Sequence, residues 1–229
     1  MRYSRFELVA IALAIVGSAA SARMAAAQLP SGWKAYTDGS RDYTVRSDVS
    51  RRDGGQGYAG VSIKANVASP RGSAMLAQSV RADAFRGKRV RLSAFLKTLR
   101  VDEGAAGLWM RVDGAQGVLS SDFMENRPLM GNNDWAERDV VLDVPLNAVG
   151  ITFGFLLSGS GEAWMDDVAL DVVSTDVATT GHPGGLYPEV RPATADAPPR
   201  ARGSQRSAYL NAPGQPVNMS LRVGSRSGT

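Results

Sequence analysis

The chain has 229 residues, of which 44% are hydrophobic, with one His and no Cys. This length suits one domain with a sizeable core plus appended segments, rather than two large domains. Zinc sites draw on Cys and His, and catalytic triads need a His, so the composition argues against both chemistries within the domain. The single histidine, His182, lies beyond the last predicted strand. No GxxxxGK[ST] or GxGxxG loop opens a helix, which excludes the common nucleotide-binding folds.

The formal net charge is +4, from 26 Lys and Arg against 22 Asp and Glu. Residues 1–27 hold three Arg and one Glu, and residues 174–229 hold six Arg and three acids, so residues 28–173 keep 17 basic and 18 acidic side chains. Domains that bind nucleic acid usually carry a strong positive field, which residues 28–173 lack. We therefore expect no nucleic-acid partner.

Residues 1–27 have the layout of a secretory signal peptide. Arg2 and Arg5 precede the apolar run LVAIALAIVGSAA, and small residues follow it. The run is shorter than the about 20 residues that span a bilayer. We expect cleavage after Ala27, with cleavage after Ala22 or an uncleaved anchor as alternatives. The signal peptide leads us to expect an exported, periplasmic or extracellular protein with no transmembrane segment in its mature part. Without Cys the chain has no lipid-attachment site and no disulfides.

Residues 28–173 alternate between strand patterns and turn signals. The clearest strand is 88–98, in which Val90, Leu92, Ala94 and Leu96 share one face. Turn signals include DEG (102–104), DGAQG (113–117), GNND (131–134) and SGSG (158–161), and the one helix-compatible stretch, 80–87, is short. We expect strands at 32–37, 42–47, 60–67, 73–80, 88–98, 107–113, 118–124, 137–144, 151–158 and 163–173. This spacing predicts an all-β, antiparallel β-sandwich of the jelly-roll type.

The composition changes after residue 173. Residues 174–208 are rich in Pro, Gly, Ala and Arg and lack periodicity, which predicts a disordered linker. Residues 209–229 regain a strand-like alternation at Val217, Met219 and Leu221. Residues 209–229 are either a short strand that docks on the domain or the remnant of a lost structural element, and the alternation does not decide between the two.

One face of the strand GLWMRVD (107–113) is polar and aromatic. Trp109, Arg111 and Asp113 alternate with the apolar residues of the other face. If residues 118–124 pair with this strand through the DGAQG turn, Trp109 and Arg111 come close to Asp122 and Met124, and Arg111 forms an ion pair with Asp122. Arg127 follows shortly after. An indole beside hydrogen-bonding charged groups suits sugar recognition, whereas the alternative is an ordinary polar face with a covered tryptophan.

The closing strand, EAWMDDVALDVV (162–173), places a carboxylate on an apolar row. Asp166 shares the parity of Trp164 and Val168 unless a bulge intervenes. A carboxylate buried in this way needs a partner. Asp166 or its neighbour Asp167 therefore either accepts local hydrogen bonds or helps to hold a structural Ca²⁺, and a catalytic role is the least favoured of the three.

Several of these stretches together resemble bacterial β-sandwich domains of the galactose-binding-like, carbohydrate-binding-module type. The resemblance spans residues 32–173 and is carried by FRGKRVRLSAFLKT, GLWMRVDG, SDFMENRPLMGNNDW and ITFGFLLSGSGEAWMDDVAL. Such domains occur alone, in AraC-type transcriptional regulators and in some hydrolases. Asp122, Met124, Arg127 and Pro128 match the family pattern, but Phe123 replaces its Asn. In related modules the closing-strand acid helps to hold Ca²⁺, and Asp166 or Asp167 would be its counterpart.

We therefore expect an exported, non-catalytic module that binds a carbohydrate or a similar polar ligand. Its candidate ligand-binding residues are Trp109, Arg111, Asp122, Met124 and Arg127. The one candidate cofactor is a structural calcium ion. One alternative is a structural or protein-interaction module that uses residues 174–229 as a tether. The least favoured alternative is a hydrolase that uses Asp122 or Glu125.

Overall fold

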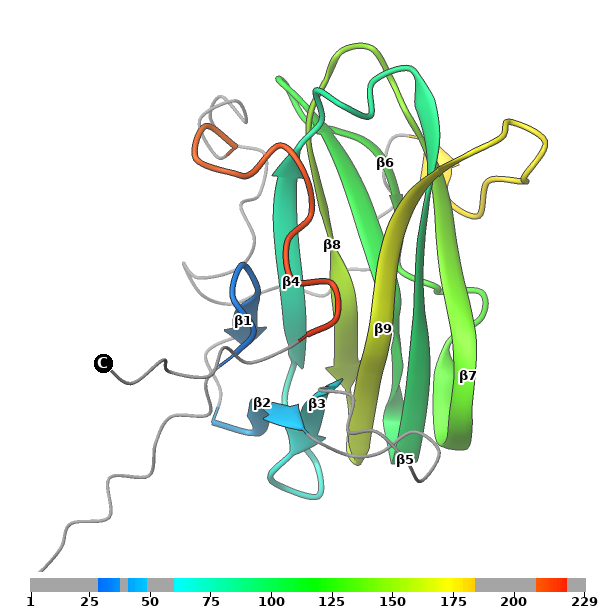
Figure 1. Cartoon of the computed structure of the whole chain (residues 1–229). Helices are drawn as coiled ribbons and strands as arrows, with labels where there is room; N and C mark the ends of the chain where they lie inside the picture. Colours follow the sequence, from blue (N-terminus) through cyan, green and yellow to red (C-terminus); the bar gives the residue numbers. More distant parts are fainter. Residues whose placement is uncertain (1–28, 38–40, 49–59, 184–208, 222–229) are drawn as a thin grey trace, which may run out of the picture.

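The computed structural model describes residues 29–37, 41–48, 60–183 and 209–221. These residues form ten strands and no helix, which confirms the all-β prediction (Figure 1). Within the same residues no helix is long and apolar enough to cross a membrane. The predicted signal peptide lies outside the described residues. The strands are β1 (Lys34–Thr37), β2 (Tyr43–Asp48), β3 (Gly60–Ala65), β4 (Ser73–Arg81), β5 (Lys88–Gly114), β6 (Val118–Asp122), β7 (Leu129–Val144), β8 (Ala148–Ser158), β9 (Glu162–Val173) and β10 (His182–Pro183).

The long strand β5 connects the two layers of the sandwich. Its first part pairs antiparallel with β9 and β7, and its last part pairs antiparallel with β8 and β6. Strands β3 and β2 extend the first layer beyond β9, and β4 and β1 extend the second layer beyond β8. Figure 1 shows the strands of both layers running roughly side by side along the molecule.

The core lies between the two layers. Val90, Leu92, Ala94 and Leu96 of β5 are all buried there, as their alternation predicts. Leu108 and Met110, from the last part of the same strand, belong to the same core cluster. The face of β5 that carries Trp109, Arg111 and Asp113 is therefore the outer face of the second layer.

Two predicted turns are absent, because the strands continue through them. The DEG stretch at 102–104 lies inside β5, and the GNND stretch at 131–134 lies inside β7. Strand β5 bends at this point instead, with positive φ at Arg100 (51°) and Glu103 (55°) and three shifts in its register against β7. Bulges of this kind let one strand serve two layers. The short helix-compatible stretch 80–87 forms no helix: Val80 and Arg81 end β4, and residues 82–87 form a bend and turns.

The folded unit extends beyond residue 173, where the sequence placed its boundary. Thr180 bonds to Val141 of β7, and β10 adds an antiparallel partner to β6. Residues 209–221, which we call the C-terminal segment, pack along β4, where the backbone N–H of Arg81 donates to the carbonyl of Pro213 (Figure 1). The segment forms turns and irregular backbone rather than the short strand suggested by its alternation. It docks all the same, with Leu221 fully buried.

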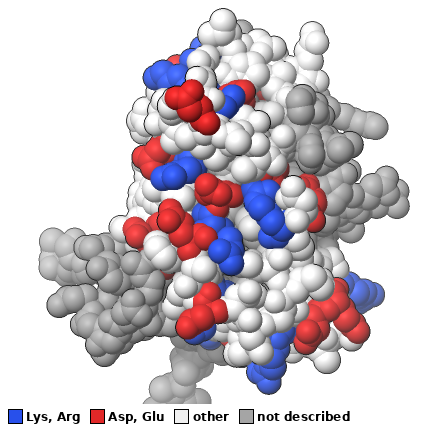
Figure 2. Space-filling model, turned by 90° about the vertical axis from the view of Figure 1, so that its right-hand side faces the viewer, with Lys and Arg blue, Asp and Glu red and all other residues white. Residues whose placement is uncertain are grey.

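The outer surface beside β7 carries charges of both signs. Figure 2 shows basic and acidic side chains interspersed over this face, with no large area of one sign. Several of them pair: Arg89 with Asp143 at 2.7 Å and Lys97 with Asp134 at 3.2 Å. Such mixed charge on an outer strand face is typical of a solvated surface that discourages edge pairing.

Candidate functional site

Trp109 lies on the outer face of the second layer, but its ring is covered. Its side chain is only 1% exposed, and its indole stacks on the ring of Phe123 with centroids 5.4 Å apart and an interplanar angle of 3°. The prediction of an open stacking platform is therefore wrong for this structure. The buried Nε1–H of Trp109 has no hydrogen-bond partner within the part of the chain that the structure describes.

Arg111 lies two residues further along the same face and pairs with Asp113. Its Nη2 is 2.9 Å and its Nε 3.0 Å from Oδ2 of Asp113, and both residues are almost completely buried. The predicted ion pair between Arg111 and Asp122 does not form. Strand β6 pairs so that Ser121 faces Arg111 while Asp122 faces Met110, which puts Asp122 on the opposite side of the layer.

Tyr209 of the C-terminal segment closes this polar cluster. Its phenolic hydroxyl donates a hydrogen bond to Asp113 and lies 2.8 Å from the hydroxyl of Thr152 on β8. Ser79 continues the chain, 2.9 Å from Thr152. Because an ionised carboxylate only accepts, the hydrogen bonds run from Ser79 through Thr152 and Tyr209 to Asp113.

Gly150 makes room for the tyrosine ring. A Cβ atom at this position would come within 2.2 Å of two ring carbons of Tyr209. Gly150 faces Asp113 across the β5–β8 ladder, so the ring lies directly over the floor that carries the carboxylate. Only glycine allows this approach without a shift.

Burial sets the protonation behaviour of the cluster. It raises the pKa of Asp113, an effect that the guanidinium of Arg111 and the hydrogen bonds from Tyr209 and Arg111 oppose. Burial, with the negative charge of Asp113, also raises the pKa of Tyr209, so the phenol stays protonated as a donor. The arrangement offers a fixed set of hydroxyl and charged groups on a dry floor.

The other three candidate binding residues form a separate structural cluster. Asp122 accepts hydrogen bonds from Arg127 Nη2 at 2.8 Å and from the backbone N–H of Met124 at 2.7 Å. Arg127 also donates to the carbonyl of Asp139 on β7. Met124 has φ 57° and is buried, with its sulfur 3.2 Å from the N–H of Leu108. We call Asp122, Met124 and Arg127 the β6–β7 clasp.

Strand β9 contains a bulge, which moves the carboxylate of Asp166 to the face opposite the core. The β5–β9 register shifts between Ser93 and Phe95, and Asp167 has φ 51°. Met165 and Val168 face the core, so Trp164 and Asp166 do not, and the bulge that the prediction allowed for breaks the expected row. Asp166 is buried and accepts the backbone N–H of Asp167 at 2.7 Å, which agrees with local hydrogen bonding. The described residues hold no group of three metal-ligating side chains, and a calcium role stays a prediction.

Sequence reasoning missed Thr152 and Tyr209 as members of the outer-face cluster. Thr152 is a polar residue inside the apolar run ITFGFLL, which is a signal that could have been noticed. Tyr209 gave no local signal, because its partners lie 57 and 96 residues away in the sequence.

The two layers of antiparallel strands and the buried polar cluster on the outer face of the second layer define an antiparallel β-sandwich module. No family model matches the chain. The chain is 40% identical over 162 residues to an uncharacterized HTH-type transcriptional regulator, YbfP, of Bacillus subtilis (strain 168). The match covers 69% of this chain and 54% of the regulator, so the chain spans about half the length of this curated relative.

Solved structures to which the chain is similar include a phage tailspike domain and a bacterial xylan-binding domain. The enzymatically active domain of tailspike protein 4 from bacteriophage CBA120 has a TM-score of 0.50 at 16% identity, over 62% of this chain and 20% of that one. The CBM22-1 xylan-binding domain of Paenibacillus barcinonensis Xyn10C has a TM-score of 0.44 at 13% identity, over 63% and 87%. At these identities the tailspike likeness concerns the fold alone.

Proposed function

We propose that this β-sandwich is a non-catalytic binding module for a carbohydrate or a similarly hydroxyl-rich ligand, bound on the outer face of β5 and β8. Trp109, Arg111, Asp113 and Thr152 form the floor of the site. Of the residues expected from the sequence, Trp109 and Arg111 belong to it, whereas Asp122, Met124 and Arg127 serve the β6–β7 clasp.

The observation that carries this proposal is the buried Nε1–H of Trp109, which has no partner among the described residues. A buried donor without an acceptor costs about 1–3 kcal/mol, and native proteins keep few of them. Here the donor lies on the same strand face as the buried Arg111–Asp113 pair. A ligand oxygen supplies the missing acceptor, and the charged pair provides further directed hydrogen bonds.

Tyr209 supports the same site, because its hydroxyl bonds to both Asp113 and Thr152. A ligand hydroxyl would make the same two bonds once Tyr209 moves aside. The C-terminal segment therefore competes with the ligand, and affinity is reduced by the fraction of molecules in which the segment is docked.

The experiment is calorimetric titration of the mature chain, beginning at Gln28, with neutral xylo-, cello- and galacto-oligosaccharides. Trp109→Phe keeps a ring against Phe123 but removes the indole donor, and Trp135→Phe is the matched control on β7. We expect the wild type and the control to bind alike, and Trp109→Phe to bind at least about tenfold more weakly, a loss of about 1.4 kcal/mol. Equal binding by Trp109→Phe, or no binding by the wild type, would contradict the proposal.

We also propose export, with a signal peptide ending at Ala27. The support is the order of charges, apolar run and small residues in 1–27. N-terminal sequencing of the protein recovered from periplasm and medium tests this proposal. A chain that still begins at Met1 in the cytoplasm would contradict it.

A second candidate function is a protein-interaction module, and one comparison favours it. The relative named as a transcriptional regulator extends well beyond the matched region, so a similar domain works there as part of a larger protein. A partner that co-purifies with the full chain, and is lost when residues 184–208 are replaced by a Gly/Ser linker of equal length, would support this candidate. Saturable oligosaccharide binding without such a partner would count against it.

A further inference from the structure

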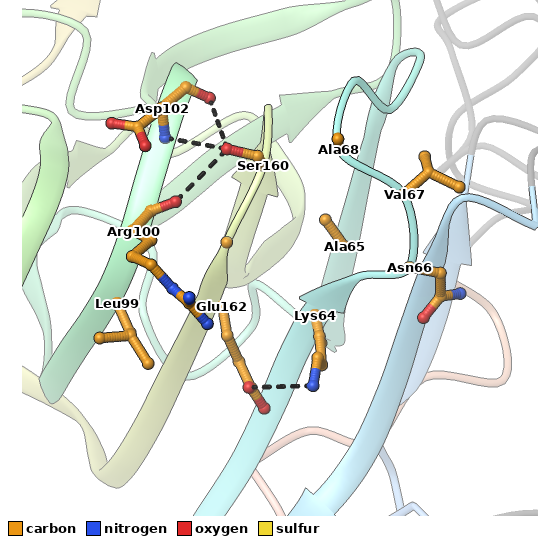
Figure 3. Close-up of a pocket in the computed structure, with 11 residues that line it drawn as sticks. Lys64, Ala65, Asn66, Val67, Ala68, Leu99, Arg100, Asp102, Ser160 and Glu162 are labelled. Atoms are coloured by element: carbon orange, nitrogen blue, oxygen red, sulfur yellow. Dashed lines mark hydrogen bonds and ion pairs between the residues drawn. The ribbon is translucent and has the colours of Figure 1, made fainter.

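A cavity lies at one end of the sandwich, away from the cluster of Arg111, Asp113, Thr152 and Tyr209. It has a volume of about 370 Å³ and is bordered by the loop after β3, the bend of β5 and the hairpin that joins β8 to β9. Figure 3 shows Lys64, Val67, Leu99, Arg100 and Glu162 around it. The volume is at the lower end of the range for small-molecule sites, which suits a ligand of one or two rings.

The rim of this end pocket is held rigidly. The Ser160 hydroxyl lies 3.3 Å from the carbonyl oxygens of Arg100 and Asp102 and accepts the N–H of Asp102 (Figure 3). Gly159 and Gly161 have φ of 74° and 87°, and a Cβ at either would lie 2.3–2.4 Å from a backbone oxygen of the β5 bend. The hairpin is thus locked against β5, and the pocket exists before any ligand enters.

Arg100 supplies a cation that forms no ion pair with any acid of the described residues. Its own backbone has φ 51°, and its N–H donates to Asn132 at 2.7 Å, which fixes the position of the residue. A non-glycine residue in this region is strained, and such strain often accompanies function. Among the described residues its guanidinium has neither an ion pair nor a hydrogen bond, and Figure 3 shows it extending along the pocket wall toward Glu162.

The acids around the pocket do not compensate Arg100. The nearly buried carboxylate of Glu162 is shared between Arg46 Nη2 at 3.3 Å and Lys64 Nζ at 3.9 Å. Figure 3 shows the Asp102 carboxylate directed away from the cavity. An anionic group on a ligand would therefore meet a guanidinium that has no acidic partner among the described residues, and its planar fork matches a carboxylate in two places.

Two exposed aliphatic side chains complete the pocket. Val67 is 46% and Leu99 40% exposed, and both line it from opposite walls. Exposed aliphatics beside polar groups provide a surface for the C–H face of a ring, while Lys64 and Glu162 can bind hydroxyl groups.

We propose that the end pocket binds an acidic sugar, that is, a polyhydroxylated ring bearing a carboxylate. The carboxylate pairs with Arg100, the ring lies between Val67 and Leu99, and ring hydroxyls bond to Lys64 and Glu162. This site is separate from the outer face of β5 and β8, so it does not depend on the function proposed there.

The test is an NMR titration of the mature chain with D-glucuronate and D-galacturonate, with D-glucose, D-galactose and acetate as comparison probes. We expect the uronates to shift the methyl signals of Val67 and Leu99, with a Kd no weaker than about 1 mM, and the neutral sugars and acetate to bind at least about tenfold more weakly. Arg100→Gln should remove the preference for uronates, and Arg100→Lys should restore only part of it. Arg138→Gln, on β7, is the matched control and should bind as the wild type does.

Three results would overturn the proposal. They are no shift with about 10 mM uronate, neutral sugars binding as tightly as uronates, and unchanged uronate binding in Arg100→Gln. The glutamine keeps the same backbone strain at this position, so a loss of binding reports the guanidinium rather than the fold. Because the indole signal of Trp109 reports the outer face, failure at either site can be recognised separately in the same spectra.

Discussion

The phenolic hydroxyl of Tyr209 donates a hydrogen bond to the carboxylate of Asp113, which lies 96 residues earlier in the chain. This contact ties the C-terminal segment to the second layer of the sandwich and closes the outer face of β5 and β8.

Tyr209→Phe keeps the ring and removes only the donor. Because the lost bond is to a buried carboxylate, we expect the free energy of unfolding to fall by about 2 kcal/mol, measured by urea denaturation. Tyr36→Phe is the control, since the Tyr36 hydroxyl has no hydrogen bond within the described residues and its loss should matter little. If both variants are as stable as the wild type, the Tyr209–Asp113 bond contributes nothing to docking.

Gly150→Ala should displace the ring sterically. The new Cβ would lie 2.2 Å from ring carbons of Tyr209, which is far below the contact distance of two non-bonded carbon atoms. We expect faster amide hydrogen exchange throughout residues 209–221, measured by mass spectrometry. Gly117→Ala, whose Cβ would meet nothing within 4 Å, is the matched control. Unchanged protection of the segment in Gly150→Ala would show that the ring does not occupy this position.

The pKa of Asp113 can be read directly by carbon NMR of its carboxyl group. We expect a value above the ordinary one of about 3.9, because burial outweighs the favourable contacts. Since the folded pKa is the higher one, the stability that this group contributes is present below its unfolded pKa and is lost as pH rises through the raised folded pKa. Tyr209→Phe should raise the pKa further, because it removes a donor to the ionised form. A value below 3.9 would mean that the cluster favours the carboxylate.

Arg127→Gln tests the structural role of the β6–β7 clasp. Asp122 is only 2% exposed, so losing its charged partner should cost about 3 kcal/mol of stability by urea denaturation. Lys97→Gln, which breaks an exposed pair with Asp134, should cost less than about 1 kcal/mol. Oligosaccharide binding should survive in folded Arg127→Gln protein. Lost binding together with unchanged stability would return Arg127 to the ligand site.

Prediction from sequence succeeded where the alternation of polar and apolar residues alone determined which face of a strand is buried. Alternation along β5 placed Leu108 and Met110 in the core and Trp109 and Arg111 on the opposite face, as the structure has them. In β6 the adjacent apolar residues Val118 and Leu119 give no preferred parity, so the face of Asp122 was chosen wrongly. A one-residue change of register moves every side chain to the other face, and bulges set that register.

Contacts between distant segments were beyond sequence reasoning. The tail offered only a weak alternation, and its docking depends on Gln78, whose side chain bonds to both backbone groups of Val217. The predicted face of Asp166 holds only if β9 has no bulge. Whether a bulge forms at Asp166 and Asp167 depends on how β9 pairs with β5. Such features follow from the assembled layers rather than from any one stretch.

The central claim, that the outer face of β5 and β8 takes a hydroxyl-rich ligand, is tested most directly by the indole N–H signals during titration with a bound oligosaccharide. The chain has four tryptophans, and Trp109→Phe identifies the signal of interest by its absence. We predict that the Trp109 signal moves downfield as its N–H gains an acceptor, while those of Trp135 and Trp164 stay in place. Saturable binding that leaves the Trp109 signal unmoved would contradict the account.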